Sequence, residues 1–160
     1  MCNKRIGYRL FGLALAFLPA AAAAQPSETD GRWRIDTGSK WEEMAAYSRA
    51  VVDGRWIFVS GTVGFDPVDG SIPTSFGAQM DQIFANIEAT LARADAELKD
   101  IVRVRSYIVD RKHVDVMAAK LKAYLDEVRP TNTTIVTELA AEGALVELEV
   151  TALKRRAKPE

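Results

Sequence analysis

The feature that most constrains the fold is a strict alternation of side-chain character between residues 144 and 152. Every second residue is apolar and those between are mostly polar: Ala144, Val146, Leu148 and Val150 form one set, and Leu145, Glu147, Glu149 and Thr151 the other. Successive side chains of a strand point to opposite faces of a sheet, so the pattern predicts a strand with one buried and one open face. Such a strand needs a sheet that is covered on one face only.

Other sequence patterns predict the remaining strands of that sheet and the helices that cover one of its faces. An Asp-Gly pair at residues 53–54, between strand-like residues 48–52 and 55–60, predicts a β-hairpin with a type I′ turn. Helical spacing of apolar residues predicts one helix over residues 76–96 and a second with the stripe Met117, Leu121, Tyr124, Leu125 and Val128, which ends before Pro130. Residues 101–109 and 133–137 are predicted strands.

This order of elements predicts an α+β fold with a mixed or largely antiparallel sheet. Two helices can cover only one face of that sheet. The uncovered face carries Glu147 and Glu149, and the alternation of the strand at 101–109 adds Arg103, Arg105 and Tyr107. A polar but partly apolar face of this kind is typical of an oligomer interface or a binding site.

Residues 1–24 are typical of a secretory signal peptide. Three basic residues precede an apolar run at residues 10–19, and a string of alanines ends at Ala24. We expect cleavage near Ala24-Gln25 and a periplasmic or secreted protein; an uncleaved anchor is the alternative, although the run is short for a membrane span of roughly 20 residues. After cleavage no association with a membrane is expected. Residues 25–44 are expected to form a loosely packed arm, and residues 155–160 a basic tail.

Composition narrows the function classes. The 160 residues suffice for one domain, and 21 Lys+Arg against 22 Asp+Glu give a net charge of −1, so no nucleic-acid partner is expected. The chain has one Cys and one His, which cannot build a structural zinc site, and no metal is expected. Cys2 lies in the predicted signal peptide, so the mature protein would have no thiol nucleophile.

Several separated motifs carry a family resemblance. The stretches YSRAVVDGRWIFVSGTVGFDPVDG, DIVRVRSYIVD, RPTNTTIV and GALVELEVTA together resemble the RidA/YjgF family of imine deaminases. The resemblance covers a domain at residues 45–154. It implies a chorismate-mutase-like fold, a homotrimer with clefts between subunits, and hydrolysis of 2-imino acids such as 2-iminobutanoate to 2-keto acids and ammonia without a cofactor.

The resemblance also suggests site residues. Tyr47 and Gly61 match cleft residues of the family, and Glu147 matches its acidic residue on the last strand. The family segment R-P-A-R-S reads here R-P-T-N-T, so Asn132 stands where the arginine that binds the substrate carboxylate is expected, and Thr134 where a cysteine is frequent. A guanidinium binds a carboxylate through two charge-assisted hydrogen bonds, which a neutral amide cannot replace. A neutral or differently charged imine, enamine or carbonyl compound is therefore the expected substrate.

Arg105 is a candidate for restoring anion binding. It shares a strand face with Arg103 and Tyr107, and it could point into the cleft. The alternative is an arginine that faces solvent or pairs with Glu149.

Two functions of different class follow. The first is a cofactor-independent hydrolase of small imines or enamines, in which Glu147 polarises a water molecule while Tyr47 and Asn132 orient the substrate. The alternative is a non-catalytic trimeric protein that binds a small molecule in the same cleft. A ribonuclease is disfavoured, because cleavage of the signal peptide would leave 18 basic and 22 acidic residues.

Overall fold

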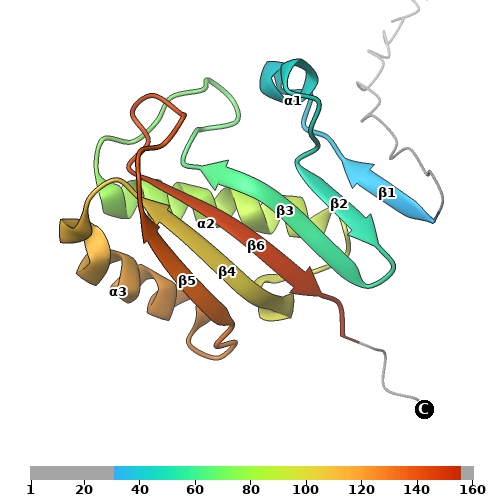
Figure 1. The fold of residues 1–160 in the computed structure, drawn as a ribbon. Helices are drawn as coiled ribbons and strands as arrows, with labels where there is room; N and C mark the ends of the chain where they lie inside the picture. The colour runs from blue at the N-terminus through green and yellow to red at the C-terminus, as the bar shows by residue number, and fades with distance from the viewer. Residues whose placement is uncertain (1–30, 156–160) are drawn as a thin grey trace, which may run out of the picture.

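The structure is a computed structural model that describes residues 31–155 (Figure 1). The predicted signal peptide at residues 1–24 and residues 156–160 of the basic tail lie outside the described residues.

One six-stranded sheet forms the centre of the molecule, in the order β1-β2-β3-β6-β4-β5. The strands are β1 (Arg32–Ile35), β2 (Ala50–Asp53), β3 (Trp56–Val63), β4 (Ile101–Ile108), β5 (Thr131–Val136) and β6 (Val146–Leu153). Strands β4 and β5 are parallel and all other neighbours are antiparallel. The expected mixed sheet of an α+β fold is confirmed.

Helices α2 (Phe76–Ala92) and α3 (Val114–Leu125) both lie against the same face of this sheet (Figure 1). Their apolar stripes meet the inward side chains of the strands, and the largest buried residues there include Met80, Phe84, Ile87, Ile108 and Leu148. Short 3-10 helices at Leu98–Asp100 and Arg111–His113 precede β4 and α3. Within residues 31–155, no helix covers the other face of the sheet (Figure 1).

The alternation in the last strand is confirmed. Val146, Leu148, Val150 and Ala152 are buried, whereas Glu147, Glu149, Thr151 and Leu153 are half-buried on the open face. The open face also carries Trp56 and Phe58 of β3, whose rings stack with centroids 6.3 Å apart. These two side chains remain 44% and 48% exposed, which is unusual for large aromatic groups at the centre of a sheet.

Two local predictions were wrong in detail. The hairpin turn places Gly54 and Arg55 between the paired residues Asp53 and Trp56, and of these two only Gly54 has a positive φ, whereas a type I′ turn needs both. Helix α2 ends at Ala92 rather than at residue 96. It ends there because Asp95 adopts a φ of 52° and the amides of Ala94 and Ala96 both donate to the Leu91 carbonyl oxygen.

The segment expected to be a loose arm is partly ordered against the sheet. β1 pairs with β2, and its Ile35 side chain is buried in the core. Helix α1 (Lys40–Met44) follows, with the Ser39 hydroxyl accepting a hydrogen bond of 3.3 Å from the Trp41 amide as its N-cap. The lead-in therefore extends the sheet and places α1 near the start of β2 (Figure 1).

Candidate functional site

The carboxyl group of Glu147 lies directly over Gly61. β3 and β6 pair regularly up to Val59, then shift register so that Thr62 faces Leu148 and Val63 faces Glu147. Ser60 and Gly61 form the resulting bulge. A Cβ atom built on Gly61 would overlap the Glu147 Oε1 atom and lie 2.9 Å from its Cδ. The glycine therefore provides the space that the carboxyl group occupies.

Arg49 also binds this bulge. Its Nη1 donates to the Gly61 carbonyl oxygen at 3.1 Å, and its Nε lies 3.4 Å from Oε1 of Glu42. The guanidinium also lies over the Tyr47 ring, with 5.9 Å between its Cζ and the ring centroid. Tyr47, Gly61 and Glu147, three predicted site residues, are thus linked through one arginine.

Glu42 is a buried carboxylate on the short helix α1, with 5% of its surface exposed. It accepts hydrogen bonds of 2.7 Å from both the backbone N–H and the hydroxyl of Thr37, in addition to the ion pair with Arg49. A buried carboxylate is tolerated when its oxygens are bonded in this way. Glu42 and Tyr47 also line a polar hollow of about 380 Å³ beside α1.

The electrostatics of Glu147 are set by opposing effects. Burial raises the pKa of its carboxyl group above the usual value of 4.5, the positive charge of Arg49 lowers that pKa, and the neighbouring Glu149 raises it. Burial is the largest of the three effects. A carboxyl group whose pKa is raised towards neutrality is suited to accepting and returning a proton.

Arg105 forms an ion pair with Glu149, which is the alternative to anion binding considered from the sequence. Its Nη1 lies 3.3 Å from Oε1 and 3.5 Å from Oε2 of Glu149, and the Tyr107 hydroxyl donates to the same carboxylate at 3.3 Å. Arg105 faces Glu149 across the β4–β6 pair, and Tyr107 faces Glu147. The positive charge of Arg105 is therefore offset by Glu149.

Asn132 and Thr134 project from the opposite face of the sheet. In the parallel β4–β5 pair they are aligned with Val104 and Ser106, which are buried under the helices. The Thr134 hydroxyl lies 4.0 Å from the sulfur of Met117 on α3. Within one chain, these two predicted residues are therefore not brought together with Glu147, Gly61 and Tyr47.

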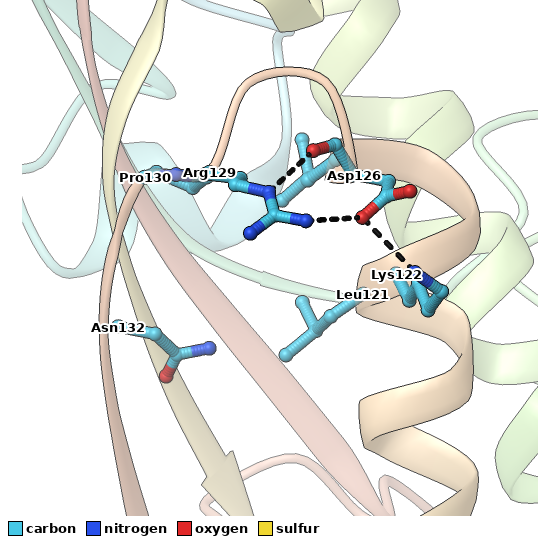
Figure 2. Close-up of a pocket in the computed structure, with 7 residues that line it drawn as sticks. Leu121, Lys122, Asp126, Arg129, Pro130 and Asn132 are labelled. Carbon is cyan, nitrogen blue, oxygen red and sulfur yellow. Dashed lines mark hydrogen bonds and ion pairs between the residues drawn. The ribbon is translucent and has the colours of Figure 1, made fainter.

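Asn132 instead lines a shallow hollow of about 230 Å³ between the start of β5 and the end of α3. Figure 2 shows its side chain projecting from the strand towards Leu121. On the rim, the Arg129 guanidinium is bonded to the Asp126 carbonyl oxygen at 3.1 Å and to its side chain at 3.4 Å (Figure 2). Arg129 therefore has its charge paired locally.

Sequence reasoning missed Arg49 and Glu42. Arg49 lies two residues after Tyr47 in the YSRAV stretch, and extending the alternation of β2 backwards from Val51 would have placed it on the open face. Glu42 had no comparable signal, because its contact with Arg49 depends on how the chain turns after α1.

Residues 31–155 contain no group of three or more His, Cys, Asp or Glu side chains that could hold a metal ion. Over the same range, no helix combines the length and apolar character that a membrane crossing requires.

Comparisons with known proteins agree on the fold. The sequence model of the family described as "Endoribonuclease L-PSP" matches residues 37–154. The structure is similar to that of Rv2704 from Mycobacterium tuberculosis, described as a member of the YjgF/YER057c/UK114 family, with a TM-score of 0.70 and 32% identity over 77% of this chain and 99% of that chain. This similarity agrees with the chorismate-mutase-like architecture expected from the sequence.

Two curated relatives differ in their sequence identity to this chain. A RutC family protein of Aquifex aeolicus is 33% identical over 113 residues, which are 69% of this chain and 90% of that protein. The 2-iminobutanoate/2-iminopropanoate deaminase of Rattus norvegicus is 25% identical over 121 residues, which are 75% of this chain and 88% of that protein.

Proposed function

The chain belongs to the endoribonuclease L-PSP family, which is also that of the RutC and YjgF proteins, and we propose that it is a hydrolase of small imines or enamines. The observation that carries this proposal is the half-buried Glu147 carboxyl group, held over Gly61 on an open face of the sheet. No cofactor takes part in the reaction proposed here.

The proposed reaction needs one proton carrier. The Glu147 carboxylate accepts a proton from a water molecule as the water oxygen bonds to the imine carbon, and the electron pair of the C=N bond moves to nitrogen. Glu147 then returns the proton to the nitrogen, which gives a carbinolamine. In a second transfer Glu147 takes the proton of the carbinolamine hydroxyl group and delivers it to the nitrogen as the C–N bond breaks, so that ammonia leaves and the carbonyl group forms. One imine and one water thus become one carbonyl compound and one ammonia, and the protein ends in its starting state.

Charge selects the substrate. Asn132 offers no positive charge, and the cations Arg49 and Arg105 each already have a carboxylate partner, Glu42 and Glu149. Hydrogen bonds to charged groups contribute about 1.5–3 kcal/mol each, so a missing carboxylate partner corresponds to roughly a tenfold to hundredfold loss in transition-state binding. A neutral imine, or its protonated cationic form beside Glu147, is favoured over a 2-imino acid.

We propose that the site is completed by a second subunit of a homotrimer. Asn132 and Thr134 lie on the edge strand β5, whereas Glu147 lies at the start of the inner strand β6. A cleft between two subunits would let one chain supply Glu147, Gly61 and Tyr47 and its neighbour supply Asn132 and Thr134. The exposed aromatic pair Trp56 and Phe58 supports an interface on the open face.

The experiment is a comparison of ammonia release from freshly generated 2-iminobutanoate and from the neutral imine of butanone. We expect the purified protein to prefer the neutral imine, Glu147→Gln to lose turnover of both, and Asn132→Arg to gain roughly tenfold or more on 2-iminobutanoate. Efficient turnover of 2-iminobutanoate by the unaltered protein would refute the charge argument. Turnover that survives Glu147→Gln would refute the role of Glu147.

The second candidate is a trimeric binding protein without turnover, which the replacement of the family arginine by Asn132 favours. It predicts saturable binding of a small carbonyl or imine analogue, lost in Gly61→Val, with no ammonia released from either substrate. Measurable turnover excludes it.

We also propose export, based on the signal-peptide pattern of residues 1–24. Cell fractionation, with mass spectrometry of the mature N-terminus, tests this proposal. We expect the mature chain to begin at Gln25, and a cytoplasmic protein that retains Met1 would contradict it.

A further inference from the structure

We propose that Arg49, held by the buried Glu42, is a positioning residue for Glu147: it fixes the Gly61 bulge on which the Glu147 carboxyl group lies and places a positive charge beside that group. The inference rests on the proposed function, because it concerns the residue to which the proton transfer is given.

The contacts of Arg49 leave its guanidinium little freedom. One edge faces Glu42 through Nε at 3.4 Å, and Nη1 donates to the Gly61 carbonyl oxygen at 3.1 Å. The Tyr47 ring covers one side, and the side chain is 17% exposed. A planar guanidinium can bind a carboxylate and a carbonyl oxygen with separate N–H groups, which the single ammonium of a lysine does less well.

The Glu42 carboxylate is itself held in place by Thr37. Both hydrogen bonds from Thr37 are 2.7 Å long, and helix α1 places the carboxylate next to Arg49. A connected series of polar contacts therefore runs from Thr37 through Glu42 and Arg49 to the Gly61 carbonyl group. It joins the lead-in before β2 to the bulge in β3, where the Glu147 carboxyl group lies.

If the ion pair between Arg49 and Glu42 served only to stabilise the fold, Arg49 would have no effect on Glu147. The groups around the Glu147 carboxyl are Arg49 from the segment before β2, Glu149 on the same strand, Tyr107 opposite on β4 and Gly61 on β3. Of the charged groups that act on Glu147 within residues 31–155, Arg49 is the positive one. Arg105, the other cation considered on the open face, forms an ion pair with Glu149. Removing Arg49 is therefore expected to raise the pKa of Glu147.

The test is a direct titration of Glu147. The protein is labelled with ¹³C at glutamate carboxyl carbons, and the Glu147 signal is assigned by its loss in Glu147→Gln. We expect Arg49→Gln to move the titration midpoint of Glu147 upwards and Arg49→Lys, which keeps the charge, to move it less. Arg103→Gln is the matched control, since it removes a cation of the same open face that lies opposite Thr151, and it should leave the midpoint nearly unchanged.

Two results would overturn the inference: a midpoint in Arg49→Gln equal to that of the unaltered protein, or an upward shift no larger than that in Arg103→Gln. If the glutamine variant does not fold, as judged by circular dichroism, Arg49→Met decides, because it keeps an unbranched side chain and removes the charge. An upward shift supports the inference, and no shift or a downward shift contradicts it.

The titration is independent of turnover, so the two proposals fail separately. If no imine is hydrolysed and Arg49→Gln still shifts the midpoint, the proposed function fails and the positioning role stands. If imines are hydrolysed, the limb of the pH–rate profile that reports Glu147 should shift in the same direction as the titration, and a lysine at position 49 should restore part of it.

Discussion

The Glu147 carboxyl group occupies the space in which a residue other than glycine at position 61 would place its Cβ atom. The relationship joins the start of β6 to the bulge of β3, and it explains the glycine without any unusual backbone angle, because Gly61 is not among the residues with positive φ. The glycine is thus needed for the position of the carboxylate rather than for the path of the chain.

Gly61→Ala should therefore separate function from stability. The methyl group meets the flexible end of Glu147, which can move into solvent, so we expect a change in unfolding free energy within about 1 kcal/mol. Turnover should fall roughly 100-fold or more, because the proton carrier is displaced. Thermal melting and ammonia release check the two expectations. A variant that keeps full turnover would show that Glu147 does not act from this position.

Gly64→Ala provides the opposite case three residues later. A Cβ atom there would lie 2.9 Å from the carbonyl oxygen and 3.0 Å from the Cα of Gln79, a residue whose amide group bonds to Pro73, Gly143 and Leu145. Backbone atoms of α2 cannot move aside as a side chain can, so we expect a loss of about 1–3 kcal/mol in denaturant unfolding. Gly77→Ala, whose Cβ atom would make an ordinary contact of 3.5 Å with Lys120 Cε, serves as the control and should not destabilise.

Glu147→Gln should stabilise the protein at neutral pH. The pKa of Glu147 is raised by burial, so the folded chain retains a proton that the unfolded chain has already lost. The resulting cost to stability appears as the pH rises above 4.5, the usual value, and is complete above the pKa of the folded protein. Melting temperatures between pH 3 and 8 should show the variant gaining on the unaltered protein as the pH rises. A constant difference across that range would contradict the raised pKa.

The open face could be predicted from the sequence because the residues of β6 alternate in character. Val146 and Leu148 point inward, and Glu147 and Glu149 point outward. The sequence did not predict β1 or α1. Both are short, and they depend on tertiary contacts such as the burial of Ile35 rather than on a periodic pattern within the segment. The contact between Glu42 and Arg49 depends on this part of the fold, which explains why the sequence did not predict it.

Asn132 and Thr134 illustrate a different limit. Strand β5 is exposed along its whole length and has no apolar alternation, so nothing in the pattern says which residues face the helices. The register with Val104 and Ser106 supplies that information, and it places the two residues on the far side of the sheet from Glu147. Similarity to the family therefore identified Asn132 and Thr134 as candidate site residues but did not show where they lie relative to Glu147.

Phe58→Lys should dissociate the proposed trimer without unfolding the chain. Phe58 is 48% exposed on the open face and stacks on Trp56, so a charge there opposes a second copy more than it disturbs the core. Sedimentation equilibrium should show monomers with an unchanged circular dichroism spectrum. Turnover should be lost as well, since Glu147 and Asn132 would no longer meet. Val68→Lys, at a loop position that is 93% exposed, should remain trimeric, and a trimeric Phe58→Lys would place the interface elsewhere.

Asp81→Asn should show the opposite pH signature to Glu147→Gln. Asp81 joins α2 to α3: Lys120 Nζ lies 2.6 Å from both carboxylate oxygens, and the Tyr124 hydroxyl, whose ring stacks on Phe84, donates at 2.9 Å. The hydrogen bond from Lys120 is the main cause that lowers the pKa of Asp81 below 3.8, so this carboxylate stabilises the folded chain at neutral pH and loses that effect as the pH falls through the lowered pKa.

Because the pair is partly exposed, we expect Asp81→Asn to cost about 0.2–1 kcal/mol at pH 7 and to approach the unaltered protein in acid. Tyr124→Phe keeps the stack on Phe84 and the ion pair, so it should cost no more than one hydrogen bond and show a weaker pH dependence. Urea unfolding of the three proteins at pH 3 and pH 7 measures both effects. If Asp81→Asn were destabilised equally at both values, packing between the helices rather than the charge of Asp81 would hold α3 to α2.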